Sequence, residues 1–247
     1  PLIMAPVGAD AGPYLERLER LGLPRDYVRL IPDTLTAQAF ITTDLDDNQI
    51  TAFHPGAMNC SHENVITGDM DIDLAIVAPD GREGMLSHVE QLAALGIPFI
   101  FDPGQGLPMF SGAELLDMVG KARYVAVNDY EGRLLEERTG RSLEELAQGL
   151  EALIVTKGAE GSLIYAGGEC LHIPSVKPEA IVDPTGCGDA YRAGLLYGIA
   201  AGYDWRKTGQ LASLMGALKI ASRGGQNHHA SREQISALYE RHFGAPL

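Results

Sequence analysis

The chain has 247 residues, of which 45% are hydrophobic and 21% charged, values typical of a soluble globular protein with one sizeable core. Its 33 acidic and 19 basic residues give a formal charge of −14, which argues against broad contact with nucleic acid or an anionic membrane, because such contact needs clustered Lys and Arg. No apolar run approaches a membrane span, no secretory signal opens the chain, and the odd set Cys60, Cys170 and Cys187 is typical of a reduced, cytoplasmic protein.

The first 58 residues predict a strand, a helix and a hairpin. Residues 1–7 form an apolar run that ends at Gly8, and residues 13–21 place apolar side chains on one helical face. Two expected strands, 36–42 and 49–53, flank the polar turn 44–48. This antiparallel hairpin, within residues 34–58, is either an edge hairpin or a lid, and the pattern alone leaves both open. With no leader before the first strand, we expect the chain to begin within its fold.

From residue 73 onward, short apolar strands alternate with amphipathic helices. Strands are expected at 74–78, 97–101, 124–127, 153–156 and 163–165, and helices at 83–95, 112–120, 142–152 and 211–222. Ser142 with Glu145 three residues on is a capping box, which supports that helix start. The alternation predicts parallel βαβ units in a three-layer α/β/α sandwich that comprises residues 1–33 and 59–247, with the hairpin of residues 34–58 set apart from it; the family resemblance given below implies that this hairpin is a lid.

Polar residues directly follow several of these strands. Asp102, Asn128, Thr156 and Asp183 each come after an apolar run, and ligands of such sheets bind beyond the carboxyl ends of the strands. We therefore expect them to share one edge. The turn at 102–105 is explained by turn chemistry alone, while its position also allows Asp102 to contact a substrate.

Asn128 and Glu131 lie three residues apart at an expected helix start. This spacing suits ligands of a hydrated Mg²⁺ and its bridging phosphates. It equally suits an N-cap Asn with a capping-box Glu, which is very common.

Residues 180–194, AIVDPTGCGDAYRAG, hold the most specific pattern of the chain. The run 180–182 is expected to end a strand, 183–186 breaks it, and a helix is expected from near Gly186 to about Ala200. A glycine-rich turn into a helix presents unpaired backbone N–H groups and a positive dipole end, which together bind anions.

Asp189 within this turn needs an explanation, because a carboxylate repels a resting phosphate. A hydroxyl that attacks a phosphoryl group provides one: the carboxylate accepts the hydroxyl proton while the amides stabilise the transferring group. The alternative is that Asp189 merely complements the helix dipole.

The stretch DPTGCGDAYRAG resembles the signature of the ribokinase-like (PfkB) carbohydrate and nucleoside kinases, with Cys187 where that family most often has Ala. The resemblance implies that Asp189 is the catalytic base and that the amides of Gly186, Cys187 and Gly188 form the anion hole. It covers essentially the whole chain, except that the family's opening strand and early Gly-Gly-x-x-x-Asn stretch are missing, and truncation is the preferred explanation.

The resemblance also implies roles for residues elsewhere on the expected edge. The residues that it places at ATP and its Mg²⁺ are Asn128 and Glu131 (metal, through water), Thr156, Gly158, Gly161, Thr185 and Asn227. Without the resemblance, the turn that contains Thr156, Gly158 and Gly161 is a plain hairpin turn, and the glycine-flanked loop of Asn227 is a helix C-cap. Lys157 either screens phosphate charge or is simply solvated. Gln38, Phe40 and Phe53 on the lid are implied to face the substrate, with the strand register left open.

Within the family, residues 53–58 and 226–228 are most similar to bacterial adenosine-kinase-like members, and an aromatic lid suits a purine. We therefore expect an ATP- and Mg²⁺-dependent kinase that phosphorylates a primary hydroxyl of a nucleoside, adenosine preferred. The alternatives are a sugar or sugar-phosphate kinase and a non-catalytic nucleotide sensor. A homodimer and a monovalent-cation requirement are left open.

Overall fold

The computed structural model describes residues 1–43 and 49–247, whose strands form a central six-stranded sheet and two small two-stranded sheets. The central strands lie in the order β10-β9-β8-β7-β6-β5. Their bounds are Ala75–Val77 (β5), Phe99–Phe101 (β6), Tyr124–Asn128 (β7), Ala152–Thr156 (β8), Ser162–Ala166 (β9) and Glu169–Ile173 (β10). Strands β5 to β8 are mutually parallel, whereas β9 and β10 are added antiparallel.

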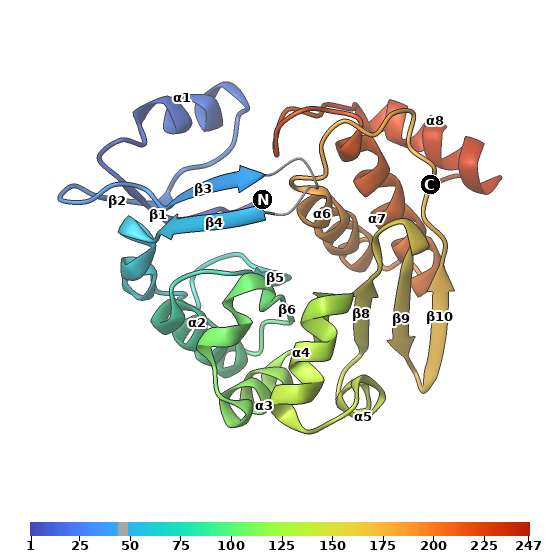
Figure 1. The fold of residues 1–247 in the computed structure, drawn as a ribbon, viewed down its shortest axis with the longest axis horizontal. Coiled ribbons are helices and arrows are strands. Elements are labelled where there is room, and N and C mark those ends of the chain that lie inside the picture. Colours follow the sequence, from blue (N-terminus) through green and yellow to red (C-terminus); the bar gives the residue numbers. More distant parts are fainter. Residues whose placement is uncertain (44–48) are drawn as a thin grey trace.

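Helices cover both faces of this sheet (Figure 1). One layer consists of Arg82–Leu95 (α2), Gly112–Lys121 (α3), Asp129–Thr139 (α4) and Leu143–Ala147 (α5). The other consists of Cys187–Ala200 (α6) and Trp205–Ile220 (α7), and Arg232–Phe243 (α8) packs against α7. Short 3-10 helices at Gly104–Met109 (η2) and Gly158–Glu160 (η3) follow β6 and β8. The predicted three-layer sandwich is confirmed.

The alternation of side chains along the central strands separates the two cores. In β7, Val125 and Val127 pack with the α2–α5 layer, while Tyr124 and Ala126 pack with α6 and α7. Burial of an aliphatic or aromatic side chain of this size contributes roughly 1.5–3 kcal/mol. A register slip of one residue would exchange the two sets, and because their side chains differ in size, the packing of each core favours the observed register.

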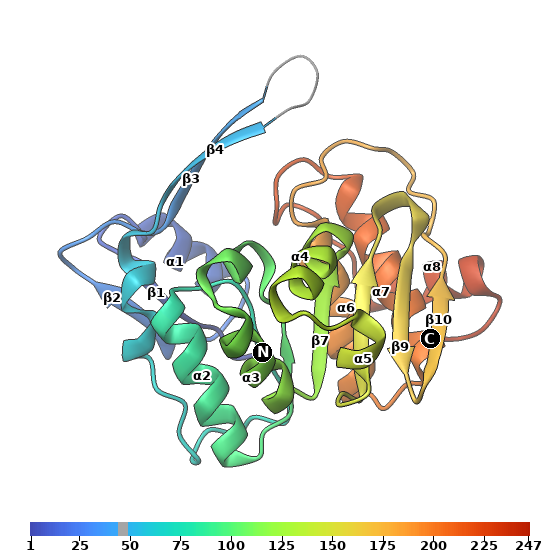
Figure 2. The same ribbon diagram turned by 60° about the horizontal axis from the view of Figure 1, so that its bottom comes forward.

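The N-terminal part forms its own small layer beside the sheet. Met4–Gly8 (β1) pairs in parallel with Tyr27–Ile31 (β2), a strand that the sequence pattern did not predict, and Gly12–Arg20 (α1) connects them. Gln38–Thr43 (β3) and Gln49–His54 (β4) form the predicted antiparallel hairpin, followed by the 3-10 helix Gly56–Glu63 (η1). The predicted turn 44–48 lies outside the described residues. Figure 2 shows the hairpin projecting on the side of the molecule where α4 leaves β7.

Three predicted elements are wrong in detail. The helix predicted at 211–222 runs from Trp205 to Ile220. Residues 180–182 are not a strand: Ile181 is 80% exposed, and the N–H groups of Val182 and the following Asp183 donate to Ile220 O at the end of α7 (2.9 and 3.1 Å). The helix predicted at 142–152 starts as expected but ends at Ala147, because the chain must turn at 148–151 to enter β8 at Ala152.

Candidate active site

The glycine turn, residues 183–188, is built around Gly186. This residue is the N-cap of α6 and has a φ of 83°, which favours glycine. A Cβ at this position would lie 2.8 Å from the carbonyl oxygen of Gly225, so the turn packs directly against a second loop, residues 222–227, here called the return loop. Both features explain why glycine is required at position 186.

The turn presents open amides. Within the described chain, the N–H groups of Gly186, Gly188 and Asp189 have no hydrogen-bond partner, as expected for the first turn of a helix. The Cys187 N–H donates to Pro184 O (3.1 Å), and its place in the anion hole stays a prediction. The thiol of Cys187 is half-buried, and burial raises its pKa.

Asp183 joins the glycine turn to the return loop through its carboxylate. Oδ1 accepts from the Thr185 N–H (2.9 Å) and Oδ2 from the Gly224 N–H (2.7 Å). These backbone hydrogen bonds, from Thr185 and then Gly224, lower the pKa of Asp183 to about 2. Thr185, predicted to contact the nucleotide, is exposed at the surface of the same turn.

Asp189 occupies the third residue of α6 and is exposed, so a ligand can reach its carboxylate. Its negative charge contributes to raising the pKa of Asp102, which shows that the two carboxyl groups are close enough to interact. The end of strand β6, where Asp102 lies, is therefore next to the start of α6, where Asp189 lies.

A buried arginine connects this turn to the rest of the edge. Arg192, one helical turn after Asp189, donates from Nη2 to Oδ1 of Asp102 (2.9 Å), and its Nε contacts Oδ2 of the same residue. Its Nη2 also lies 3.8 Å from Oε2 of Glu131. Burial raises the pKa of Asp102 to about 6, against the opposing charge of Arg192. Both carboxylate oxygens of Asp102 contact Arg192 in this structure, and a contact of Asp102 with a substrate stays a prediction.

Asn128 and Glu131 form the reciprocal capping box at the start of α4. The Asn128 N–H donates to Glu131 Oε2 and the Glu131 N–H to Asn128 Oδ1, both at 2.7 Å. Across residues 1–43 and 49–247, no three His, Cys, Asp or Glu side chains gather closely enough to hold a metal ion alone. Mg²⁺ usually keeps several waters and binds through one or two carboxylates together with substrate phosphates. Glu131, buried beside the turn, fits that water-mediated role and does not fit a site made by protein ligands alone.

The turn after β8 lies next to this box, because Thr156 pairs with Asn128 in the β7–β8 register. Gly158 and Gly161 have positive φ values of 55° and 92°, and a Cβ on Gly161 would lie 2.0 Å from Ile173 O. Lys157 forms an ion pair with Glu160 (2.9 Å). The turn chemistry is confirmed, while contact of these residues with ATP stays a prediction.

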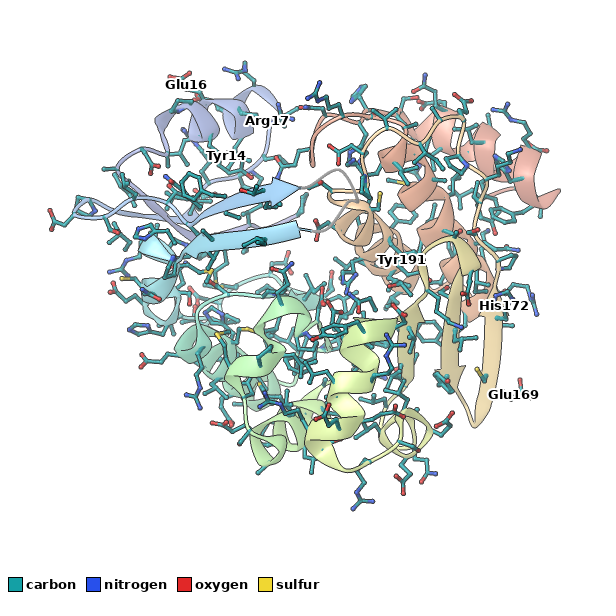
Figure 3. The ribbon with its side chains drawn as sticks, in the orientation of Figure 1. Tyr14, Glu16, Arg17, Glu169, His172 and Tyr191 are labelled. Atoms are coloured by element: carbon teal, nitrogen blue, oxygen red, sulfur yellow. The ribbon has the colours of Figure 1, made fainter. Side chains whose placement is uncertain are left out.

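The return loop also contacts α1. Asn227 is exposed and its side-chain amide donates to Arg223 O (3.0 Å), while Gln226 O accepts from Nη2 of Arg17 (2.6 Å). The Gln226 side chain donates to the hydroxyl of Tyr14 (3.3 Å). Figure 3 labels Tyr14 and Arg17 on α1, close to this loop. The N-terminal layer and the α6–α7 layer therefore meet beside the turn.

The register of the hairpin separates the lid residues. Gln38 lies opposite His54 and Phe40 opposite Ala52, whereas Phe53 lies opposite Ala39. Because alternate residues point to opposite faces, Gln38 and Phe40 share one face and Phe53 occupies the other. The sequence left open which of these three residues face the substrate, and the register allows either Gln38 and Phe40 or Phe53 to line a site from one face of the ribbon. Gln38 donates to Oδ2 of Asp10 (3.1 Å), so its face is the one toward α1.

Comparison with known proteins decides the family. A model described as "pfkB family carbohydrate kinase" matches residues 2–232. The chain belongs to this family. A nucleoside kinase of Methanothermobacter thermautotrophicus is 31% identical over 92% of this chain and 74% of its own. The structure of a Burkholderia thailandensis nucleoside kinase in complex with inosine is 55% identical, with a TM-score of 0.96 over 100% of this chain and 82% of that chain. The structure of the same kinase in complex with ADP-inosine has a TM-score of 0.95 over 99% of this chain and 77% of that chain.

This pfkB family member has the ribokinase-like α/β fold and is a phosphotransferase that acts on an alcohol group. Within the described parts of the chain, no helix combines the length and apolar character needed to cross a membrane. Two residues of the site were missed from the sequence, Arg192 and Lys219. Both are charged residues in apolar helical segments, and that contrast is the signal that could have found them.

Proposed function

We propose that this protein transfers the γ-phosphoryl group of ATP to the primary hydroxyl of a nucleoside, with Asp189 as the base. The observation that carries the proposal is the position of Asp189: an accessible carboxylate in the first turn of a helix whose Gly186 and Gly188 amides are open. Relatives named as nucleoside kinases and a neighbour solved with inosine support the nucleoside as acceptor.

The transfer follows from the groups on the turn. Asp189 accepts the hydroxyl proton as the substrate oxygen forms its bond to the γ-phosphorus. The bond from that phosphorus to the bridging oxygen breaks, and ADP leaves with the electron pair. The Gly186 and Gly188 amides donate to the charged oxygens of the transferring group. When bound with ATP, Mg²⁺ neutralises phosphate charge, and Glu131 and Asn128 would hold its waters.

The lid makes a purine the preferred base. Phe40 is 60% exposed and shares its face with Gln38, so that face offers an aromatic ring beside a polar side chain. A flat base gains from stacking on such a ring, and an amide can hydrogen-bond its edge. This argument favours a purine nucleoside, and both adenosine, the predicted acceptor, and inosine fit it. Residues 34–58 contain no Arg or Lys, which disfavours a phosphorylated sugar.

The opposite face of the lid bears Phe53, 53% exposed, and Ile41, 52% exposed. A second copy of the chain is the partner that we propose for this face, because a two-stranded ribbon with two apolar faces can cover a site with only one of them. Light scattering of Phe53→Ser should then show monomer where the original chain shows dimer.

The test of the proposed function is ADP release measured over adenosine, inosine, ribose and ribose 5-phosphate, for the original chain and for Asp189→Asn. We expect turnover with the nucleosides and a loss of about 10³-fold or more in kcat for the variant, since general base and orientation are removed together. Binding of ATP, followed by calorimetry, should persist. Glu233→Gln, an exposed acidic residue in the first turn of α8, is the matched control. An active Asp189→Asn would refute the assignment of the base.

A further inference from the structure

Lys219, in the last turn of α7, is fully buried. Its Nζ donates to two backbone carbonyls, Asp183 O at 2.9 Å and Ser222 O at 3.0 Å. No carboxylate of the described chain lies within ion-pair distance of the ammonium group, although salt bridges elsewhere in the protein are common. Burial of a charge without a counter-ion is costly, so a residue of this kind is retained where its charge is used.

The two carbonyls belong to the two loops that form the site. Asp183 opens the glycine turn, and Ser222 opens the return loop whose Gly224 N–H binds the Asp183 carboxylate. Helix α7 also packs directly behind the turn: a Cβ on Gly216 would lie 3.6 Å from Cys187 O. The Lys219 ammonium group therefore binds one carbonyl of each loop and lies behind the open amides.

The positive charge of Lys219 affects the pKa values of two residues in the glycine turn. It contributes, after the backbone hydrogen bonds from Thr185 and Gly224, to lowering the pKa of Asp183. At Cys187 burial raises the pKa and the positive charge of Lys219 opposes that rise. The pKa of His228, in the same region, is lowered first by burial and then by Lys219, so this imidazole stays neutral and adds no second cation.

An ammonium group held by backbone carbonyls has the same kind of surroundings as a K⁺ ion in a carbonyl-lined site. We propose that Lys219 is the built-in monovalent cation of this site: it holds the glycine turn against the return loop and supplies the positive charge behind the amides. It is a positioning residue, because it touches neither substrate nor phosphate. The proposal rests on the phosphoryl transfer proposed above, and its consequence is that the enzyme needs no added K⁺.

The first experiment uses the original chain alone. Turnover with adenosine is measured in KCl, NaCl and tetramethylammonium chloride at equal ionic strength, which keeps screening constant. We expect kcat to be the same within about twofold in all three salts, a difference worth only about 0.4 kcal/mol. A requirement for K⁺ would overturn the proposal, and this result does not depend on the folding of any variant.

The second experiment removes the charge. Lys219→Met keeps an unbranched side chain, Lys219→Gln keeps a donor without charge, and Lys219→Ala leaves space for a small cation. Because Lys219 acts from behind the amides, we expect less than the 10²–10³-fold loss of a direct oxyanion donor, about tenfold in kcat for Met and Gln. For Lys219→Ala, NH₄Cl or KCl should restore at least about half of the lost turnover on a logarithmic scale, and tetramethylammonium chloride should restore none.

The control is Lys207→Met in the first turn of the same helix, whose ammonium lies over the ring of Tyr203. It should leave kcat unchanged in every salt. A Lys219 variant with full turnover, or a Lys219→Ala loss that no cation reverses while its melting temperature equals that of the control, would overturn the proposal. If the original chain releases no ADP with any acceptor in any of the three salts, the proposed function fails, and this outcome is distinct from a requirement for K⁺.

Discussion

Arg192→Met tests whether the buried ion pair organises the site. The change removes the guanidinium group and keeps an unbranched side chain of similar width. The side chains of Arg192 and Asp102 are only 11% and 6% exposed, so Asp102 would remain buried without its partner. Removing one member of a buried pair costs about 3–5 kcal/mol.

The expected loss lies at the lower end of that range. The pKa of Asp102 is already raised to about 6 by burial, and loss of the opposing Arg192 charge would raise it further. The carboxyl group would then take up a proton near neutral pH and escape the full cost of an unpaired charge. We expect a loss of about 3 kcal/mol in the free energy of unfolding, or about 6–12 °C in Tm for a domain of this size.

The assay is urea unfolding of the single variants Arg192→Met and Asp102→Asn and of the double variant. Because the two side chains share one interaction, the losses should be non-additive by about 1–3 kcal/mol. Arg206→Met, an exposed residue in the first turn of α7, should stay within about 0.5 kcal/mol of the original chain. Additive losses, or an Arg192→Met variant as stable as this control, would refute the reasoning.

The same pair predicts a pH dependence. The folded-state pKa of Asp102, about 6, is above its ordinary value of 3.8, so the folded chain holds the proton more tightly. This contribution to stability is complete below about pH 4 and is lost, by about 3 kcal/mol, as the pH rises through about 6. Asp102→Asn should therefore show a flatter rise in unfolding free energy than the original chain when the pH is lowered from about 7 to 5.

Three further predictions concern the glycine turn. Gly186→Ala should lose more stability than Gly202→Ala, because both residues have positive φ but only a Cβ at position 186 meets another loop. Urea unfolding together with ATP titration would measure the difference, and equal losses would argue against the close packing. The pKa of Asp183 is lowered to about 2, so its contribution to stability is present above about pH 4 and is lost as the pH falls through about 2. The difference in unfolding free energy between the original chain and Asp183→Asn should therefore shrink below about pH 4. A constant difference would contradict the stabilisation of the carboxylate by hydrogen bonds. Cys187→Ala should keep kcat within about twofold, since the thiol has no part in proton transfer, and a large loss would give it a role.

The sequence by itself determined the architecture and the location of the site. Continuous apolar runs such as residues 124–127 can bury both faces only between two helical layers, so the sandwich follows from local pattern. The glycine turn before Asp189 likewise predicts an open helix start, and the positive φ of Gly186 favours glycine there. These features depend on residues that are close together in the sequence, so the sequence alone is enough to predict them.

Only the tertiary structure decided which groups meet. The pairing of Arg192 with Asp102 spans 90 residues, and nothing in either segment specifies the other. The lid shows the same limit: each strand was predictable, but the pairing of Ala39 with Phe53 sets which ring shares a face with Gln38. In the sequence, Lys219 differs from other helical lysines only by its apolar neighbours, and packing decides that it is buried with two carbonyls around its ammonium group. Burial and long-range pairing are properties of the folded chain as a whole, and the electrostatics of the site arise from them.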